Sequence, residues 1–142
     1  MCARAAATSA GVIAKQRFSA DILSEFSKSK GLRIRAGTGP HRFIGIWFVV
    51  VNVRVFVRSW SVKPRGWYRK FLAKPRGTVQ IANRQIAVRA VKTRDKRLRD
   101  AVDRAYLEKY STPWEIKYAR DLGTPKSRAT TLELKPFKPI DR

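Results

Sequence analysis

Hydroxyl and cationic side chains are concentrated in one short stretch of the sequence, which reads SWSVKPR. Ser59 and Ser61 are followed at close spacing by Lys63 and Arg65. A helix is expected to begin directly afterwards. Hydroxyl groups, cationic side chains and the free N–H groups of a helix N-terminus are the groups that bind phosphate in proteins. The stretch therefore predicts a phosphate pocket, and the alternative from spacing alone is a basic loop beside aromatic core residues.

Three aromatic residues lie within or directly after this stretch and add a second kind of chemistry. Trp60, Trp67 and Tyr68 offer flat surfaces that can stack on a planar ring. A phosphate pocket next to flat aromatic surfaces indicates a ligand that carries both a phosphate and a ring system. The other interpretation places the same three side chains in the hydrophobic core.

The cysteine and histidine content excludes several kinds of active site. Cys2 is the only cysteine, so we expect no internal disulfide and no cysteine-based zinc site, and we interpret this residue as incidental. His41 is the only histidine, which excludes a histidine-rich metal site and any Ser-His-Asp triad built without it. It falls in a Gly/Pro-rich loop, residues 36–42, where it is either a proton donor or a solvated side chain.

The positive charge of the chain is concentrated in its central part. Lys and Arg number 32 against 10 Asp and Glu, which gives a formal net charge of +22. Residues 26–94 contain 17 Lys and Arg and no carboxylate. Such a surface repels itself, and an anionic partner would relieve the repulsion. The candidate partners are a phosphorylated small molecule, nucleic acid and an anionic membrane surface, and the alternative is a general compositional bias.

The hydrophobic pattern predicts one small domain of the α+β class. The longest apolar run, residues 44–51, is too short to cross a membrane, so we expect no membrane segment and a cytoplasmic location. Strand-like alternation and adjacent turns favour a small antiparallel barrel over a doubly wound sheet. The expected domain is residues 18–136, between a flexible extension (1–17) and a tail (137–142). The expected helices are 19–30, 67–73, 95–110 and 114–122, and the expected strands are 32–35, 44–51, 53–60, 78–82, 85–91 and 130–134, with a hairpin turn at Asn83-Arg84.

Residues 56–63 (FVRSWSVK) resemble the strand-to-loop segment of split β-barrel flavin-binding proteins, the pyridoxamine-phosphate-oxidase-like group. Ser61 and Lys63 stand at the S-x-K positions of that segment, and a helix ending in an Ala-Lys-Pro turn (73–75) follows. The Trp-Tyr pair at 67–68 is similar to the pair that opens this helix in deazaflavin-dependent nitroreductase-like members.

The sequence also resembles the bacterial family called domain of unknown function 2255, which is related to these barrels. The matching segments are IWFVV (46–50), VRSW (57–60), GWYR (66–69), AYLEKY (105–110) and RATTLELKP (128–136). The resemblance implies a split β-barrel of about six strands with flanking helices, often dimeric, with a flavin-type phosphate near residues 59–63. It implies no known activity. Arg58 departs from the flavin pattern, where a small polar residue is usual, and either strengthens phosphate binding or fills the pocket.

These observations lead to one functional hypothesis and two alternatives. The first is a homodimeric barrel that binds FMN or a deazaflavin and carries a possible oxidoreductase activity. The alternatives are a basic nucleic-acid-binding barrel, which would use the acid-free centre, and a non-catalytic structural barrel. The candidate cofactor-binding residues are Arg58, Ser59, Ser61, Lys63, Arg65, Trp67 and Tyr68.

Overall fold

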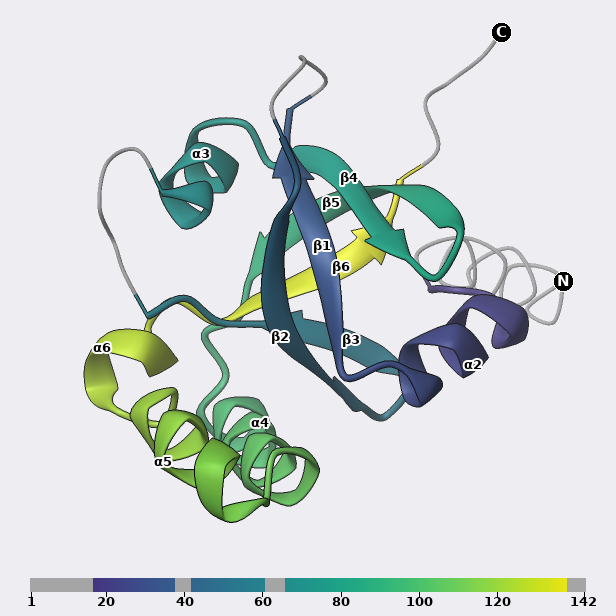
Figure 1. Ribbon diagram of the computed structural model, residues 1–142. Helices are drawn as coiled ribbons and strands as arrows, with labels where there is room; N and C mark the ends of the chain where they lie inside the picture. Colours follow the sequence, from purple (N-terminus) through teal and green to yellow (C-terminus); the bar gives the residue numbers. More distant parts are fainter. Residues whose placement is uncertain (1–16, 38–41, 61–65, 138–142) are drawn as a thin grey trace, which may run out of the picture.

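The computed structural model describes residues 17–37, 42–60 and 66–137 (Figure 1). Cys2, His41, Ser61, Lys63 and Arg65 lie outside the described residues. The described part contains five helices and six strands, in the order α2 (Ala20–Lys28), β1 (Gly31–Ala36), β2 (Ile44–Val51), β3 (Arg54–Val57), α3 (Trp67–Ala73), β4 (Arg76–Ile81), β5 (Arg84–Lys92), α4 (Lys96–Lys109), α5 (Pro113–Asp121), α6 (Pro125–Arg128) and β6 (Leu132–Pro136).

The six described strands form a closed antiparallel barrel in the order β1-β2-β3-β6-β5-β4. Pairing of β1 with β4 closes the circle, with Ile34 opposite Val79. Because successive side chains of a strand point to opposite faces, alternate residues fill the interior. The expected α+β fold with a six-stranded antiparallel barrel is therefore confirmed. The buried side chains that the strands contribute to the barrel core are Leu32, Ile34, Ala36, Phe48, Val55, Val57, Val79, Ile81, Val88, Ala90, Leu132 and Leu134.

Two helices complete the barrel core from opposite ends (Figure 1). Helix α2 begins at Ser19, whose Oγ accepts a hydrogen bond from the Ile22 N–H at 3.3 Å, as expected for an N-cap. It contributes the fully buried Phe26. Helix α3 contributes Trp67, Tyr68 and Phe71 to the same core.

A second layer covers the outer face of β2 and β3. Helices α4 and α5 bury their apolar side chains against Val49 and Phe56, which point away from the barrel interior. Asp95 and Thr112 cap the two helices through their side-chain oxygens, and Pro113 occupies the first turn of α5. Both helices lie within two residues of their predicted bounds, whereas the short α6 is an element that the sequence analysis did not predict.

Three predicted strand or turn positions need correction. Strand β3 ends at Val57 and not at residue 60, because Arg58 and Ser59 bond to α4, α5 and residues 130–131 instead. The β4–β5 turn is formed by residues 82–83, since Ile81 pairs with Arg84. Strand β6 begins at Leu132 and not at residue 130, because Thr130 and Thr131 hydrogen-bond back to α6.

Gly77 allows α3 to approach the barrel closely. A Cβ atom at this position would lie 2.3 Å from the carbonyl oxygen of Arg35 and 2.5 Å from Cζ of Phe71. Neither neighbour has room to move, because Arg35 belongs to the paired strand β1 and Phe71 is 1% exposed.

We expect Gly77→Ala to lower the free energy of unfolding by about 2 kcal/mol or more, because the new methyl group overpacks the junction of α3 and β4. Gly45→Ala is the matched control, since a Cβ there meets nothing within 4 Å. Urea denaturation of both variants measures the difference. Equal stabilities would show that the junction tolerates the methyl group.

Candidate functional site

The described members of the predicted cofactor site occupy two different parts of the fold. Trp67 and Tyr68 are 9% and 4% exposed and belong to the barrel core, where Trp67 packs edge-on against Tyr68 and Phe71. Arg58 and Ser59 follow β3 and lie against the layer formed by α4, α5 and α6. The rings of Trp67 and Tyr68 therefore act in the structure as part of the core that closes one end of the barrel.

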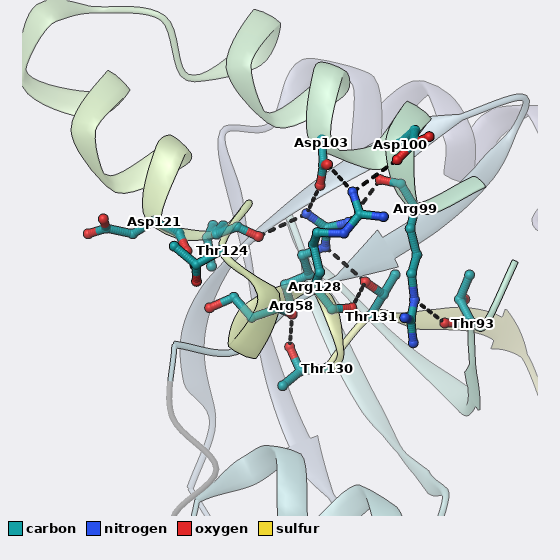
Figure 2. Close-up of polar contacts among 12 residues, drawn as sticks. Arg58, Thr93, Arg99, Asp100, Asp103, Asp121, Thr124, Arg128, Thr130 and Thr131 are labelled. Carbon is teal, nitrogen blue, oxygen red and sulfur yellow. Dashed lines mark hydrogen bonds and ion pairs between the residues drawn. The ribbon is translucent and has the colours of Figure 1, made fainter. Parts of the chain in front are cut away.

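The guanidinium of Arg58 is fully buried and bonded to groups of this chain (Figure 2). Its Nε donates to Thr131 Oγ1 at 2.9 Å, and Nη2 donates to the Arg99 carbonyl at 3.0 Å. Nη1 donates to Asp103 Oδ1 at 2.5 Å and to the Leu122 carbonyl at 2.8 Å. Burial lowers the pKa of Arg58, and the hydrogen bond to Asp103 opposes this shift.

Asp103 joins Arg58 to a second arginine. Its Oδ2 accepts a hydrogen bond from Arg128, which also pairs with Asp100 at 3.1 Å. Ser59 extends the network through its backbone N–H, which donates to Thr130 Oγ1 at 2.8 Å. The network connects the end of β3 to α4, α5 and the segment before β6, so the observed contacts of Arg58 are structural ones.

We expect Arg58→Met to lower the free energy of unfolding by about 3 kcal/mol, because it removes the four hydrogen bonds of a buried guanidinium and leaves Arg128 as the remaining cationic partner of Asp103. Arg104→Met removes an exposed arginine from α4, the helix that carries Asp103. We expect it to lower the free energy of unfolding by less than about 0.5 kcal/mol. Chemical denaturation measures both values. A loss below about 1 kcal/mol for Arg58→Met would contradict a structural role for this network.

Aromatic side chains fix β2 against α4. The rings of Trp47 and Tyr110 stack at a centroid distance of 3.9 Å and an interplanar angle of 4°. The Tyr106 hydroxyl donates to the Trp47 carbonyl at 3.3 Å. Lys109 donates to the Phe48 carbonyl at 3.0 Å, and its Nζ lies 3.4 Å from the centroid of the Phe48 ring. Burial, with a smaller effect from the charge of Lys30, lowers the pKa of Lys109 to about 8.

This pKa predicts a rise in stability at alkaline pH. Between about pH 8 and pH 10 the unfolded chain keeps the Lys109 proton while the folded chain releases it, so the free energy of unfolding increases with pH. Above about pH 10 the trend reverses, because burial raises the pKa of Tyr106 and of Tyr110 and the unfolded chain loses these protons first. Urea unfolding of the wild type and Lys109→Met from pH 7 to 9.5 isolates the lysine. As the pH rises, the free energy of unfolding of the wild type should increase relative to that of Lys109→Met. A difference that stays constant with pH would contradict the lowered pKa of Lys109.

A groove of about 700 Å³ lies on the outside of the barrel, between residues of β1, β2 and β4 and Trp60. Trp60, the last described residue before Ser61 of the predicted phosphate stretch, lines it together with Trp47, and the two ring centroids are 5.8 Å apart. Trp60 is 46% exposed, so its ring is accessible. The residues that line the groove are Gly31, Leu32, Arg33, Gly45, Ile46, Trp47, Trp60, Gln80, Ile81 and Ala82.

Sequence reasoning named Trp60 as a surface for ring stacking but did not predict the groove or its other lining residues. Arg33 and Gln80 face each other across β1 and β4, and Gly31 lies opposite Trp47 across β1 and β2. Their outward positions follow from strand alternation. Their proximity depends on the register of strands up to 50 residues apart, which the sequence pattern alone does not give. Among the described residues, no group of three His, Cys, Asp or Glu side chains is placed to hold a metal ion.

Two solved structures share the fold of this barrel. The barrel is similar to "conserved hypothetical protein Rv2991" of Mycobacterium tuberculosis, with a TM-score of 0.51 and 13% identity over 87% of this chain and 82% of that one. It is also similar to the "putative pyridoxamine 5'-phosphate oxidase" of Listeria innocua, with a TM-score of 0.52 and 13% identity over 82% of this chain and 90% of that one. At this identity the likeness shows a common split-barrel fold.

The particular family follows from the sequence match. Residues 22–134 match the family described as "uncharacterized protein conserved in bacteria (DUF2255)", and the chain belongs to it. The resemblance stated from the segments at 46–50, 57–60, 66–69, 105–110 and 128–136 is thereby confirmed. No curated protein matches the chain. Within the described residues, no helix is both long and apolar enough to cross a bilayer.

Proposed function

We propose that the protein binds a phosphorylated cofactor of the flavin type, FMN or a deazaflavin, in the groove beside Trp60. The observation that supports this most directly is the position of the groove. It is lined by an accessible tryptophan, and that tryptophan immediately precedes the Ser61–Lys63 stretch that resembles the phosphate segment of split-barrel flavin proteins. The likeness of the fold to a "putative pyridoxamine 5'-phosphate oxidase" supports the same class of ligand.

The groove has the size and lining that a planar cofactor requires. A volume of about 700 Å³ lies within the range of small-molecule sites. Trp47, Trp60 and Ile46 provide apolar walls, while Arg33 and Gln80 provide hydrogen-bond donors. Gly45 leaves space in the groove, since a Cβ atom at this position would meet nothing within 4 Å. The residues present therefore fit a ring system with polar substituents.

Three residues would bind the phosphate in this proposal. Ser61, Lys63 and Arg65 follow Trp60 directly and supply one hydroxyl and two cationic groups. Arg58 is not assigned to the ligand, because its donors are bonded to Asp103, Thr131 and backbone carbonyls. When bound, a flavin-type cofactor supplies hydride chemistry, and the barrel would orient it and shield one ring face with tryptophan.

A homodimer and a cytoplasmic location belong to the same proposal. The resemblance to split-barrel flavin proteins favours a dimer, and light scattering of the purified protein would measure its mass. The proposed oxidoreductase activity depends on the cofactor and is tested after binding has been demonstrated.

Titration with FMN and with a deazaflavin cofactor tests the proposal. We expect one of them to quench tryptophan fluorescence, and Lys63→Ala to weaken this binding by roughly tenfold or more, because a charge-assisted hydrogen bond to phosphate is lost. Trp60→Ala should also weaken it. Lys74→Ala is the matched control, because it removes an exposed lysine from the C-terminal end of α3, and should leave affinity unchanged.

Two results would contradict the proposed function. The first is the absence of binding of either cofactor to the wild-type protein in the titration. The second is an equal loss of affinity in Lys63→Ala and Lys74→Ala, which would indicate a general effect of charge.

A further inference from the structure

We propose that the outer face of β1, β4, β5 and β6 binds the sugar–phosphate backbone of single-stranded nucleic acid. Helices α4 and α5 cover the outer face of β2 and β3 and lie away from β4 and β5 (Figure 1). Arg76, Gln85 and Arg89 are all exposed there. This face lies mainly outside the cofactor groove, so the inference does not depend on the proposed function.

Strand register brings five cationic side chains together on this face. Arg76 of β4 lies directly opposite Arg89 of β5, and Arg89 lies opposite Lys135 of β6. On β1, Arg35 is opposite Thr78, which is two residues from Arg76 on the same face of β4. Arg33 continues the series to the edge of the groove. We call these five residues the basic band: Arg33, Arg35, Arg76, Arg89 and Lys135.

The basic band has no accessible acidic counterpart on its own strands. Strands β1, β4 and β5 together contain six Arg and Lys and no Asp or Glu. Strand β6 contains Glu133, but its Oε1 lies 2.7 Å from Nη2 of Arg54 and the residue is only 7% exposed. Like charges placed directly opposite each other across a sheet are destabilising. A bound polyanion would relieve this repulsion.

Aromatic rings hold two of these arginines in place. The guanidinium carbon of Arg35 lies 4.5 Å from the centroid of Phe43, and that of Arg76 lies 4.4 Å from the centroid of Phe137. Contacts of this kind orient a guanidinium without consuming its hydrogen-bond donors. The band therefore presents oriented donors that phosphate oxygens can accept from.

The shape of the band favours a single nucleic-acid strand over a membrane. Three inter-strand steps of about 4.8 Å make the band about 14 Å long, and the right-handed twist of the sheet curves its path. A flexible strand can follow such a path, whereas a membrane surface is flat. Thr78, Gln80 and Gln85 lie among the cations and provide neutral hydrogen-bonding groups instead of apolar groups for insertion. At the groove, Trp60 is accessible for base stacking beside Arg33.

Fluorescence anisotropy with a labelled oligodeoxythymidine of about 20 nucleotides tests the inference. We expect binding at low salt whose affinity falls with a log–log slope of about −3, since each neutralised phosphate of a single strand contributes about −0.7. The double variant Arg76→Gln/Arg89→Gln should weaken binding by about tenfold and reduce the slope by about 1.4. Its melting temperature should not fall, because the substitution removes like-charge repulsion.

The matched control is Arg104→Gln/Arg120→Gln, which removes the same charge from exposed positions of α4 and α5. It should change affinity by less than about twofold. An equal loss in both double variants would overturn the inference, because binding would then depend only on net charge. The absence of oligonucleotide binding, or binding confined to vesicles that contain phosphatidylserine, would also overturn it. FMN titration of the same variants separates this surface from the cofactor groove, since neither substitution touches the groove lining.

Discussion

The arrangement of this protein depends on filling the interior of a closed barrel. Six short strands can bond to one another around a circle, but apolar side chains from elsewhere must complete the core at the two ends. Phe26 of α2 and Phe71 of α3 serve this purpose, and Gly77 is the position that lets Phe71 approach the strands. The aromatic residues of α3 are therefore core residues, although in the sequence they directly follow the predicted phosphate-binding stretch.

The network around Arg58 has a comparable effect between β3 and the layer of α4 and α5. It fixes the direction of the chain where β3 ends, and hence the position of Trp60. Trp60 emerges from this point next to Trp47 and the groove. A buried structural arginine beside the proposed cofactor site would support the geometry of that site without contacting the ligand, in agreement with the general need for preorganised binding residues.

The sequence was sufficient for features that depend on local physics. The expected helices 19–30 and 95–110 and the expected strands 78–82 and 85–91 each depend on patterns of residues a few positions apart, and each matches an observed element. The role of Arg58 could not be predicted in this way, because its partners Asp103 and Thr131 lie 45 and 73 residues away. The turn at residues 52–53 departs from residue preference at Val53. Both residues adopt positive φ angles, 51° and 58°, although a β-branched residue rarely does so.

Closure of the barrel also determines how copies of this protein can associate. In an open sheet, the two edge strands expose unpaired N–H and C=O groups, which can accept a strand from another molecule. Here β1 bonds to both β2 and β4, and every other described strand likewise has two neighbours. A second copy therefore cannot extend the sheet without first opening it. An assembly that keeps the barrel closed therefore uses surfaces other than strand edges, and substitutions on those surfaces can change its strength and specificity without altering the hydrogen-bonded frame.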